Sequence, residues 1–109
     1  MVTDANAALD ALGDPQRREI LRLLGEGDKP VHAIAESLPI SRPAVSRHLR
    51  LLRAAGFVDQ RAEGTERIYS LEAEGVAAVQ AYLETVWGDA IARFRIVAEN
   101  TSPTKEPKR

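Results

Sequence analysis

The stretch SRPAVSRHLRLLRAAGFV, residues 41–58, decides the predicted fold of this chain. Ser41 offers its hydroxyl as an N-cap, and Pro43 falls in the first turn of a helix, where its missing N–H does no harm. Gly56 then supplies the left-handed residue that ends a helix. The stretch therefore predicts an amphipathic helix over residues 42–54. Apolar residues at helical spacing form its buried face: Val45, Leu49 and Leu52.

The opposite face of this helix is basic. No acidic residue lies between Glu36 and Asp59, although the whole chain has a net charge of −1. A helix fits the major groove of B-DNA, and Arg matches the O6 and N7 acceptors of guanine. A run of charge taken alone is more often a solvated helix face. The basic residues are four arginines: Arg42, Arg47, Arg50 and Arg53.

Three shorter helices are predicted before the basic one. Asp4 caps a helix over residues 4–12, and Asp14 caps a second helix that has Pro15 at its first position. A third helix of two turns follows Pro30. Its apolar residues recur at i, i+3, i+4 and i+7: Val31, Ile34, Ala35 and Leu38. A short helix, a tight turn and a basic helix reproduce the layout of a helix-turn-helix.

A β-hairpin is predicted directly after the basic helix. Two short β-like runs, residues 57–61 and 67–71, flank a turn that contains a glycine. Such a hairpin would form a wing, and Arg61, Thr65 and Arg67 around its tip could reach phosphates or the minor groove. Two acidic residues of the same loop weaken its basic character: Glu63 and Glu66.

A long amphipathic helix is predicted beyond residue 72, because apolar residues recur there every three or four positions. Left uncovered, such a stripe would expose more apolar surface than a monomer usually tolerates. In so small a chain it more often packs against a second subunit than lines a small-molecule pocket, and both interpretations stay open. With the first helix it gives the expected dimer interface: Ala8, Leu12, Val79, Leu83, Val86, Trp87, Ile91 and Phe94.

Together these elements predict a mainly α fold with a small β-hairpin. The expected architecture is a winged helix-turn-helix with the order α-α-α-α-β-β-α. A chain of 109 residues is long enough for one core, which a second subunit could extend. Residues 1–100 are therefore expected to form one DNA-binding and dimerisation domain. Residues 101–109 contain no apolar side chain and are expected to be a disordered tail.

Several classes of function are excluded by what the sequence lacks. The chain has no Cys, and therefore no disulfide, thiolate metal site or Cys nucleophile. It has no dinucleotide or Walker-type phosphate loop, and Ser46 and His48 lie on different faces of one helix, so they cannot act as nucleophile and base. We therefore expect no enzymatic activity and no cofactor. The first residues show neither the basic nor the apolar segment of a signal peptide, and no apolar run is long enough for a membrane span, so we expect a cytoplasmic location.

Four segments together resemble the ArsR family of bacterial winged helix-turn-helix repressors. They are DPQRREILRLL (14–24), PVHAIAE (30–36), residues 41–58 and EGTERIYSL (63–71), and the resemblance covers residues 5–98. It implies a homodimer, paired through its first and last helices, that binds double-stranded operator DNA and blocks transcription. It also implies which residues contact bases: Ser41, Arg42, Ala44, Ser46, Arg47 and His48.

The chain departs from the metal-sensing members of that family. Those members carry a Cys-x-Cys-type pair on the third helix, or His and carboxylate ligands on the last helix. At the position of the Cys-x-Cys-type pair this chain has Val31, His32 and Ala33, and it has no His after His48. Two His on different helices without Cys do not make a metal site. We therefore expect a regulator without a metal site. The sequence does not identify a small-molecule inducer. The alternatives are a winged-helix module that binds protein and a repressor with a small-molecule pocket near its last helix.

Overall fold

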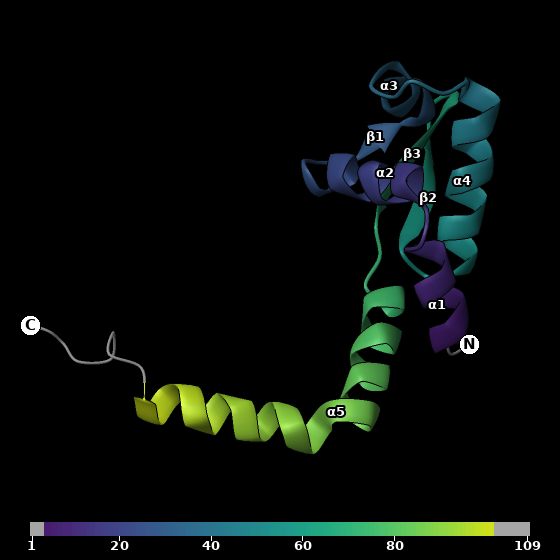
Figure 1. Cartoon of the computed structure of the whole chain (residues 1–109). Helices are drawn as coiled ribbons and strands as arrows, with labels where there is room; N and C mark the ends of the chain where they lie inside the picture. Colours follow the sequence, from purple (N-terminus) through teal and green to yellow (C-terminus); the bar gives the residue numbers. More distant parts are fainter. Residues whose placement is uncertain (1–3, 102–109) are drawn as a thin grey trace, which may run out of the picture. The chain divides into compact units, whose positions relative to one another are not determined.

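The structure is a computed structural model that describes residues 4–101. The described chain divides into two units, the first ending at Val79 and the second beginning at Gln80, within the last helix. Figure 1 shows the elements. In chain order they are α1 (Ala5–Ala11), α2 (Pro15–Gly25), β1 (Lys29–Pro30), α3 (Val31–Glu36), α4 (Arg42–Ala54), β2 (Val58–Glu63), β3 (Glu66–Leu71) and α5 (Glu74–Thr101).

The predicted N-caps of α1, α2 and α4 are confirmed. The Asp4 carboxylate accepts from the Asn6 N–H over 3.3 Å. The Asp14 carboxylate accepts from the N–H groups of Gln16 and Arg17 at 2.8 and 3.2 Å. Ser41 Oγ accepts from the Ala44 N–H over 3.2 Å. Each side chain satisfies a backbone donor that the first turn of a helix leaves unpaired.

The sheet has three strands instead of the predicted two. Its order is β1-β3-β2, and both pairs are antiparallel. β1 consists of Lys29 and Pro30, which lie opposite Tyr69 and Ile68 of β3. A strand of two residues is too short for an alternating pattern, and Pro lacks the N–H that a central strand needs, so the sequence gives no strand signal here. The observed order is thus α-α-β-α-α-β-β-α.

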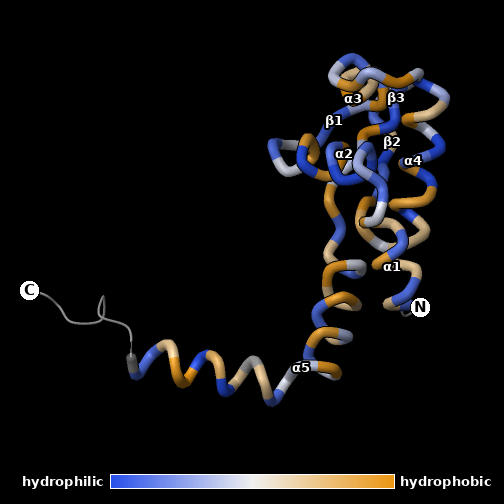
Figure 2. The backbone as a smooth tube through the Cα atoms, viewed as in Figure 1, coloured by the Kyte–Doolittle hydropathy of each residue, from blue (hydrophilic) through white to orange (hydrophobic). Residues whose placement is uncertain are grey.

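The first unit has one apolar core. α4 contributes Val45, Leu49 and Leu52 as predicted, all fully buried. Figure 2 shows that hydrophobic and hydrophilic residues alternate along the helices of this unit, which is the pattern that buries one face of each helix. α1, α2, α3 and β2 supply further buried side chains: Ala8, Ala11, Ile20, Leu23, Leu24, Ile34 and Val58.

The end of α4 and the start of α5 meet at a backbone contact. Gly56 has a φ of 83° and ends the helix as predicted, because glycine adopts this left-handed conformation without a steric penalty. The Gly75 N–H donates to the Gly56 carbonyl over 2.8 Å. A Cβ on Gly75 would lie 2.8 Å from the Ala55 carbonyl and 2.9 Å from the Phe57 ring. Only glycine therefore fits at this contact.

Two predicted boundaries differ in the structure. The hairpin is longer than expected, since β2 extends to Glu63 and β3 begins at Glu66. The expected tail began at residue 101, but Thr101 is the last residue of α5. The rest of that tail, 102–109, lies outside the described residues.

Candidate nucleic-acid interface

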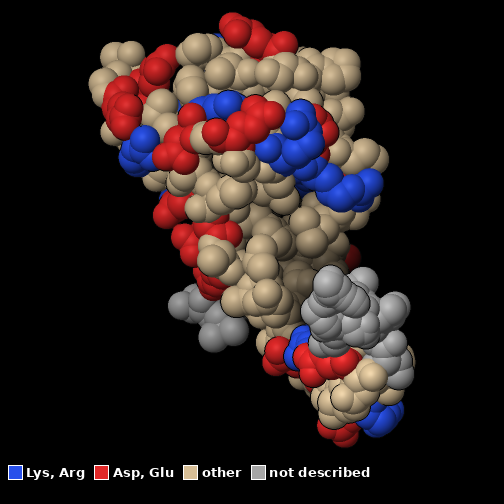
Figure 3. Space-filling view, turned by 90° about the vertical axis from the view of Figure 1, so that its left-hand side faces the viewer, with Lys and Arg blue, Asp and Glu red and all other residues tan. Residues whose placement is uncertain are grey.

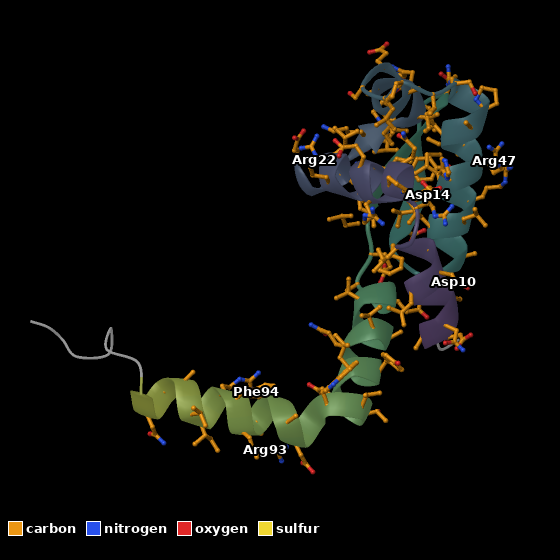
Figure 4. The ribbon with its side chains drawn as sticks, viewed as in Figure 1. Asp10, Asp14, Arg22, Arg47, Arg93 and Phe94 are labelled. Atoms are coloured by element: carbon orange, nitrogen blue, oxygen red, sulfur yellow. The ribbon has the colours of Figure 1, made fainter. Side chains whose placement is uncertain are left out.

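The four arginines of α4 all lie on its exposed surface. Arg47 points away from the first unit on the outer side of α4 (Figure 4). The buried Val45, Leu49 and Leu52 fix this orientation, because they commit the opposite side of the helix to the core. The predicted outward basic face is therefore present.

Three of these arginines have no ionic partner. Among residues 4–101, no carboxylate lies within 4.0 Å of Arg42, Arg47 or Arg50. Arg53 differs, since its Nε lies 3.6 Å from the carboxylate of Asp59 on β2. The N-terminal two-thirds of α4 thus carries uncompensated positive charge, which is the requirement for binding a polyanion.

α2 shows the opposite case. Figure 3, which views the left-hand side of Figure 1, shows basic and acidic side chains next to each other. Arg22, at the left end of α2 in Figure 4, donates to Glu19 over 2.8 Å and to Glu26 over 3.1 Å. The hydrogen bond to Glu19 is the main cause that raises the pKa of Arg22. Arg22 is therefore neutralised within the protomer, unlike Arg42, Arg47 and Arg50 of α4.

The wing contains one neutralised and one free arginine. Arg61 donates to Asp28 over 2.8 Å and to Glu63 over 2.9 Å, and these hydrogen bonds raise its pKa. Arg67 makes no ion pair within the described part of the chain. Thr65, at the turn, is exposed. The positive charge of the wing that is available to a partner is therefore that of Arg67, whereas the sequence suggested both arginines.

A small cavity of about 180 Å³ lies where the wing meets the start of α4. Arg42, Thr65 and Arg67 line it, so the structure brings together three residues that the sequence placed on two separate elements. Glu66 also lines it and lies 2.9 Å from His32 of α3. No local pattern predicts this contact, because the two residues lie 34 positions apart in the chain.

The remaining predicted contact residues of α4 are less exposed than its arginines. Ala44, Ser46 and His48 are half-buried. The Ser41 hydroxyl already accepts the capping hydrogen bond from Ala44, but its hydrogen is still available to a partner. Nδ1 of His48 lies 3.4 Å from the guanidinium of Arg17 on α2. Sequence reasoning missed Arg17, since nothing in a helical pattern links residues 31 positions apart.

The predicted dimer-interface residues are mostly exposed in the single chain. On α5, Leu83, Val86, Trp87 and Phe94 are exposed, and Phe94 is 70% exposed. The Trp87 and Tyr82 rings form a T-shaped pair with a centroid distance of 6.5 Å. Val79 is half-buried against the core of the first unit, and the side chain of Ile91 lies outside the described residues.

On α1 the predicted interface needs a correction. Ala8 is 0% exposed and belongs to the core of the protomer, so it has no surface left for a partner. Ala8 and Ala11 of α1 belong to the same core cluster as buried residues of α2 and α4. Leu12 is half-buried, and Leu9 of α1 is a large apolar side chain that is exposed.

Leu12 also lines an apolar groove of about 500 Å³ in the first unit. Its other walls come from α2, the end of β3 and the start of α5, and Leu21, Leu71 and Val76 are among them. Phe57 lies at its base, where it is nearly fully buried. The groove could hold an apolar molecule or an apolar side chain of a second subunit.

Neither a metal cluster nor a membrane span is found in the described part of the chain. Residues 4–101 contain no group of three or more His, Cys, Asp or Glu side chains that could hold a metal ion. His32 approaches Glu66 and, at 3.9 Å, Glu36. Within the same residues, no helix combines the length and hydrophobicity needed to cross a bilayer.

Known proteins resemble this chain in sequence and structure. The family model described as "Bacterial regulatory protein, arsR family" matches residues 14–60. The HTH-type transcriptional regulator Rv2034 of Mycobacterium tuberculosis is 41% identical over 87 residues, which are 80% of this chain and 81% of that protein. The transcriptional repressor SdpR of Bacillus subtilis is 41% identical over 66 residues, 61% of this chain and 73% of that protein.

A solved structure extends the similarity to the fold. It is the solution structure of the homodimeric winged helix-turn-helix DNA-binding domain of Mb0332 from Mycobacterium bovis, described as a possible ArsR-family transcriptional regulator. It superposes with a TM-score of 0.61 at 27% identity and covers 95% of this chain and 86% of that domain. α3, α4 and the β2–β3 hairpin thus correspond to a helix-turn-helix and its wing.

Proposed function

This chain belongs to the ArsR family of bacterial regulatory proteins, and from that membership we propose that it is a homodimeric repressor of its own or an adjacent operon. The winged helix-turn-helix fold predicted from the sequence is confirmed. Its relatives are transcriptional regulators, which also confirms that the chain is not an enzyme. The repressor role, the operator and the cytoplasm as the place of action are parts of the proposal.

The observation that carries the proposal is the uncompensated charge on the outer face of α4. Arg42, Arg47 and Arg50 are exposed and have no ionic partner among residues 4–101, whereas Arg22 and Arg61 are paired. A solvated surface gains little by keeping one helix free of acidic neighbours, but a phosphate backbone binds such a face strongly.

The geometry supports a division of labour between α4 and the wing. Arg47 lies in the first half of α4, the end that a helix-turn-helix places deepest in the major groove, so we assign it to base contact. Arg67 lies on the wing and lines the same small cavity as Arg42, so we assign Arg67 to the phosphate backbone. Arg50 and Arg53 lie further along the helix and are assigned to phosphates as well.

Dimerisation is supported by the exposed apolar residues of α5. Leu83, Val86, Trp87 and Phe94 would all remain in contact with water in an isolated chain, and a contiguous apolar patch usually marks an interface. A two-fold symmetric pair would also present two copies of α4 to two half-sites of an operator. The homodimeric state of Mb0332 is consistent with this arrangement.

DNA binding independent of metal is the remaining part of the proposal. Its support is the donor set, since the chain has no Cys and only two His, and these lie on α3 and α4. Zinc and thiophilic ions require three or four converging ligands, most often nitrogen or sulfur. Zn, Cd, Ni and arsenite are therefore expected to leave operator binding unchanged.

The test is footprinting of the purified protein on the DNA upstream of its own gene, followed by anisotropy titrations on the protected sequence. Binding is expected to weaken with salt, with a slope of about −0.9 in log K per phosphate neutralised. Failure to bind double-stranded DNA at low salt would contradict the proposal, and would favour a winged-helix module that contacts protein. A metal that releases the DNA at a stoichiometric ratio would contradict only the metal-independent part.

A second candidate, a repressor that senses a small apolar molecule, is favoured by the groove lined by Leu12, Leu21 and Val76. Its lining is almost entirely apolar, as is usual for ligand sites. Fluorescence of an apolar dye bound to the dimer tests this candidate. A small apolar molecule that displaces the dye and also releases operator DNA would support this candidate. A groove that is already covered in the dimer would exclude it.

A further inference from the structure

The guanidinium of Arg17 is held between α1 and α4. Its Nε donates to the Ala11 carbonyl over 2.8 Å, and its Nη2 donates to the Asp10 carbonyl over 3.2 Å. Both carbonyls lie in the last turn of α1, where carbonyls lack the usual helical partner, and that of Asp10 also accepts from the Gly13 N–H over 3.0 Å. The third nitrogen, Nη1, lies 3.4 Å from Nδ1 of His48.

In the contact between Arg17 and His48, only Arg17 can donate the hydrogen bond. A guanidinium has five N–H donors and no acceptor, so it can bond to Nδ1 of His48 only if that nitrogen carries a lone pair. In a neutral imidazole the hydrogen must then be on Nε2. Nε2 makes no hydrogen bond to any of the described residues, and the side chain of His48 is only half-buried. In this tautomer the ring therefore has an N–H donor that the described residues do not use.

We propose that Arg17 is a positioning residue that holds His48 as the Nε2–H tautomer, so that His48 contacts DNA as a hydrogen-bond donor. The inference rests on the proposed function, because DNA is the partner it assumes. A donor suits a phosphate oxygen, the O6 or N7 of guanine and the O4 of thymine, and it does not suit the amino groups of cytosine or adenine. Arg17 thereby influences recognition without contacting DNA.

The first experiment needs no DNA. Long-range ¹H–¹⁵N correlation spectra of the free protein at about pH 8.5, where imidazole is ordinarily neutral, report which ring nitrogen carries the hydrogen. Only two histidines have to be assigned, and His32→Gln identifies them. We expect His48 to show an unprotonated Nδ1. A spectrum with the hydrogen on Nδ1 would overturn the proposal, whatever the protein does on DNA.

The second experiment separates positioning from helix capping. Arg17→Gln removes a group that can only donate, so the His48 ring nitrogens should shift towards a mixture of the two tautomers, and Arg17→Lys should restore the Nε2–H form. Arg18→Gln is the matched control, because Arg18 also donates to a carbonyl at the end of α1, that of Leu12 over 2.7 Å, without contacting His48. Equal effects of the Gln variants on the His48 spectrum would refute a positioning role.

The third experiment tests the donor on DNA. The amide nitrogen of Gln overlaps best with Nε2 of imidazole, and that of Asn with Nδ1. His48→Gln should therefore keep operator affinity within about threefold, whereas His48→Asn should lose about tenfold, the usual effect of one hydrogen bond to a charged or strongly polar group. If Asn binds as well as Gln, His48 does not act through Nε2, and the proposal fails.

The same titrations show whether the acceptor is a phosphate or a base. They also separate failure of the proposed function from failure of this inference. A loss of equal size on operator and random duplexes identifies a phosphate, and a loss on the operator alone identifies a base edge. A wild-type protein that binds no DNA would remove the proposed function, while the tautomer would still be decided by the spectra of the free protein. Wild-type binding with an Nδ1–H spectrum would leave the proposed function standing and overturn this inference alone.

Discussion

Arg53, near the end of α4, lies 3.6 Å from Asp59 at the start of the wing, so one of the four arginines of the recognition helix is partly neutralised by its own chain. Both side chains are exposed, and an exposed pair of this kind contributes only about 0–1 kcal/mol. A DNA phosphate can therefore replace Asp59 as the partner of Arg53, but it must do so against the negative charge that remains.

Asp59→Asn is accordingly expected to tighten binding to operator and random DNA alike, by up to about fivefold at low salt. The gain should vanish at high salt and in the double variant Arg53→Ala/Asp59→Asn. Anisotropy titrations at several salt concentrations measure both effects. Weaker binding by Asp59→Asn would show that the pair positions the wing.

Arg47→Ala is expected to cost about 1–3 kcal/mol on the operator and little on random DNA, since a base contact is lost and the phosphate contacts remain. Arg22→Ala is the control, because Arg22 is paired with Glu19 and Glu26 and its loss should change neither affinity. Equal losses on the two duplexes would place Arg47 on the backbone instead.

On the wing, Arg67→Ala is expected to weaken operator and random DNA equally and to lower the salt slope by about one unit per protomer. Arg61→Ala should leave the slope unchanged, because Asp28 and Glu63 already hold that guanidinium. Salt titrations of both variants decide between them. Loss of discrimination in Arg67→Ala would mean that the wing reads bases.

Replacing Leu83 and Trp87 by Glu is expected to give monomers, since both side chains are exposed on α5 and charge cannot be buried at an apolar interface without a large penalty. Operator affinity should fall with dimerisation, because two linked half-sites gain from a high effective concentration. Sedimentation at micromolar concentration is the measurement, with Glu84→Gln on the same helix as control. A wild-type monomer would contradict the prediction.

We expect the stability of the fold to depend on pH through the carboxyl group of Asp14. Its partial burial alone would raise the pKa of its carboxyl, but the N–H groups of Arg17 and Gln16 outweigh burial and lower this pKa. The ionised form therefore stabilises the fold above the ordinary carboxyl pKa of about 4, and this contribution is lost as the pH falls through the lowered value. Asp14→Asn should melt below the wild type at neutral pH, and the difference should disappear in acid.

Thermal unfolding followed by circular dichroism measures that difference. Asp10→Asn is the matched control, because the Asp10 carboxylate makes no hydrogen bond to any of the described residues and only its carbonyl is used. A difference between wild type and Asp14→Asn that persists in acid would mean that the charge of Asp14 is not its source.

Local signals of the sequence predicted most of the fold. Asp14, Ser41 and Gly56 act within a few residues of their own positions, and each helix boundary that they predict is confirmed. β1 was missed because its evidence is its partner, Tyr69 and Ile68, which lies about 40 residues away. The sequence predicted Ala8 in the dimer interface, but Ala8 lies in the core of the protomer. A helical pattern shows which residues share a face and not what covers that face.

The candidate site was predictable in its residues and not in its electrostatics. The sequence identified the arginines of α4 and of the wing from their charge and order. Two features of the site join residues more than 30 positions apart: the ion pair of Arg61 with Asp28 and the contact of Arg17 with His48. Such pairs form only when the helices and the sheet have packed, and one sequence carries no pattern for them.

The backbone contact at Gly75 makes the first turn of α5 and the last turn of α4 mechanically one piece. The hydrogen bond from Gly75 to Gly56 and the close approach to Ala55 leave no side chain between them to absorb a displacement. A packed junction of this kind shifts as a unit, because interiors transmit strain instead of damping it. A displacement of the first turn of α5 would therefore move the last turn of α4 with it.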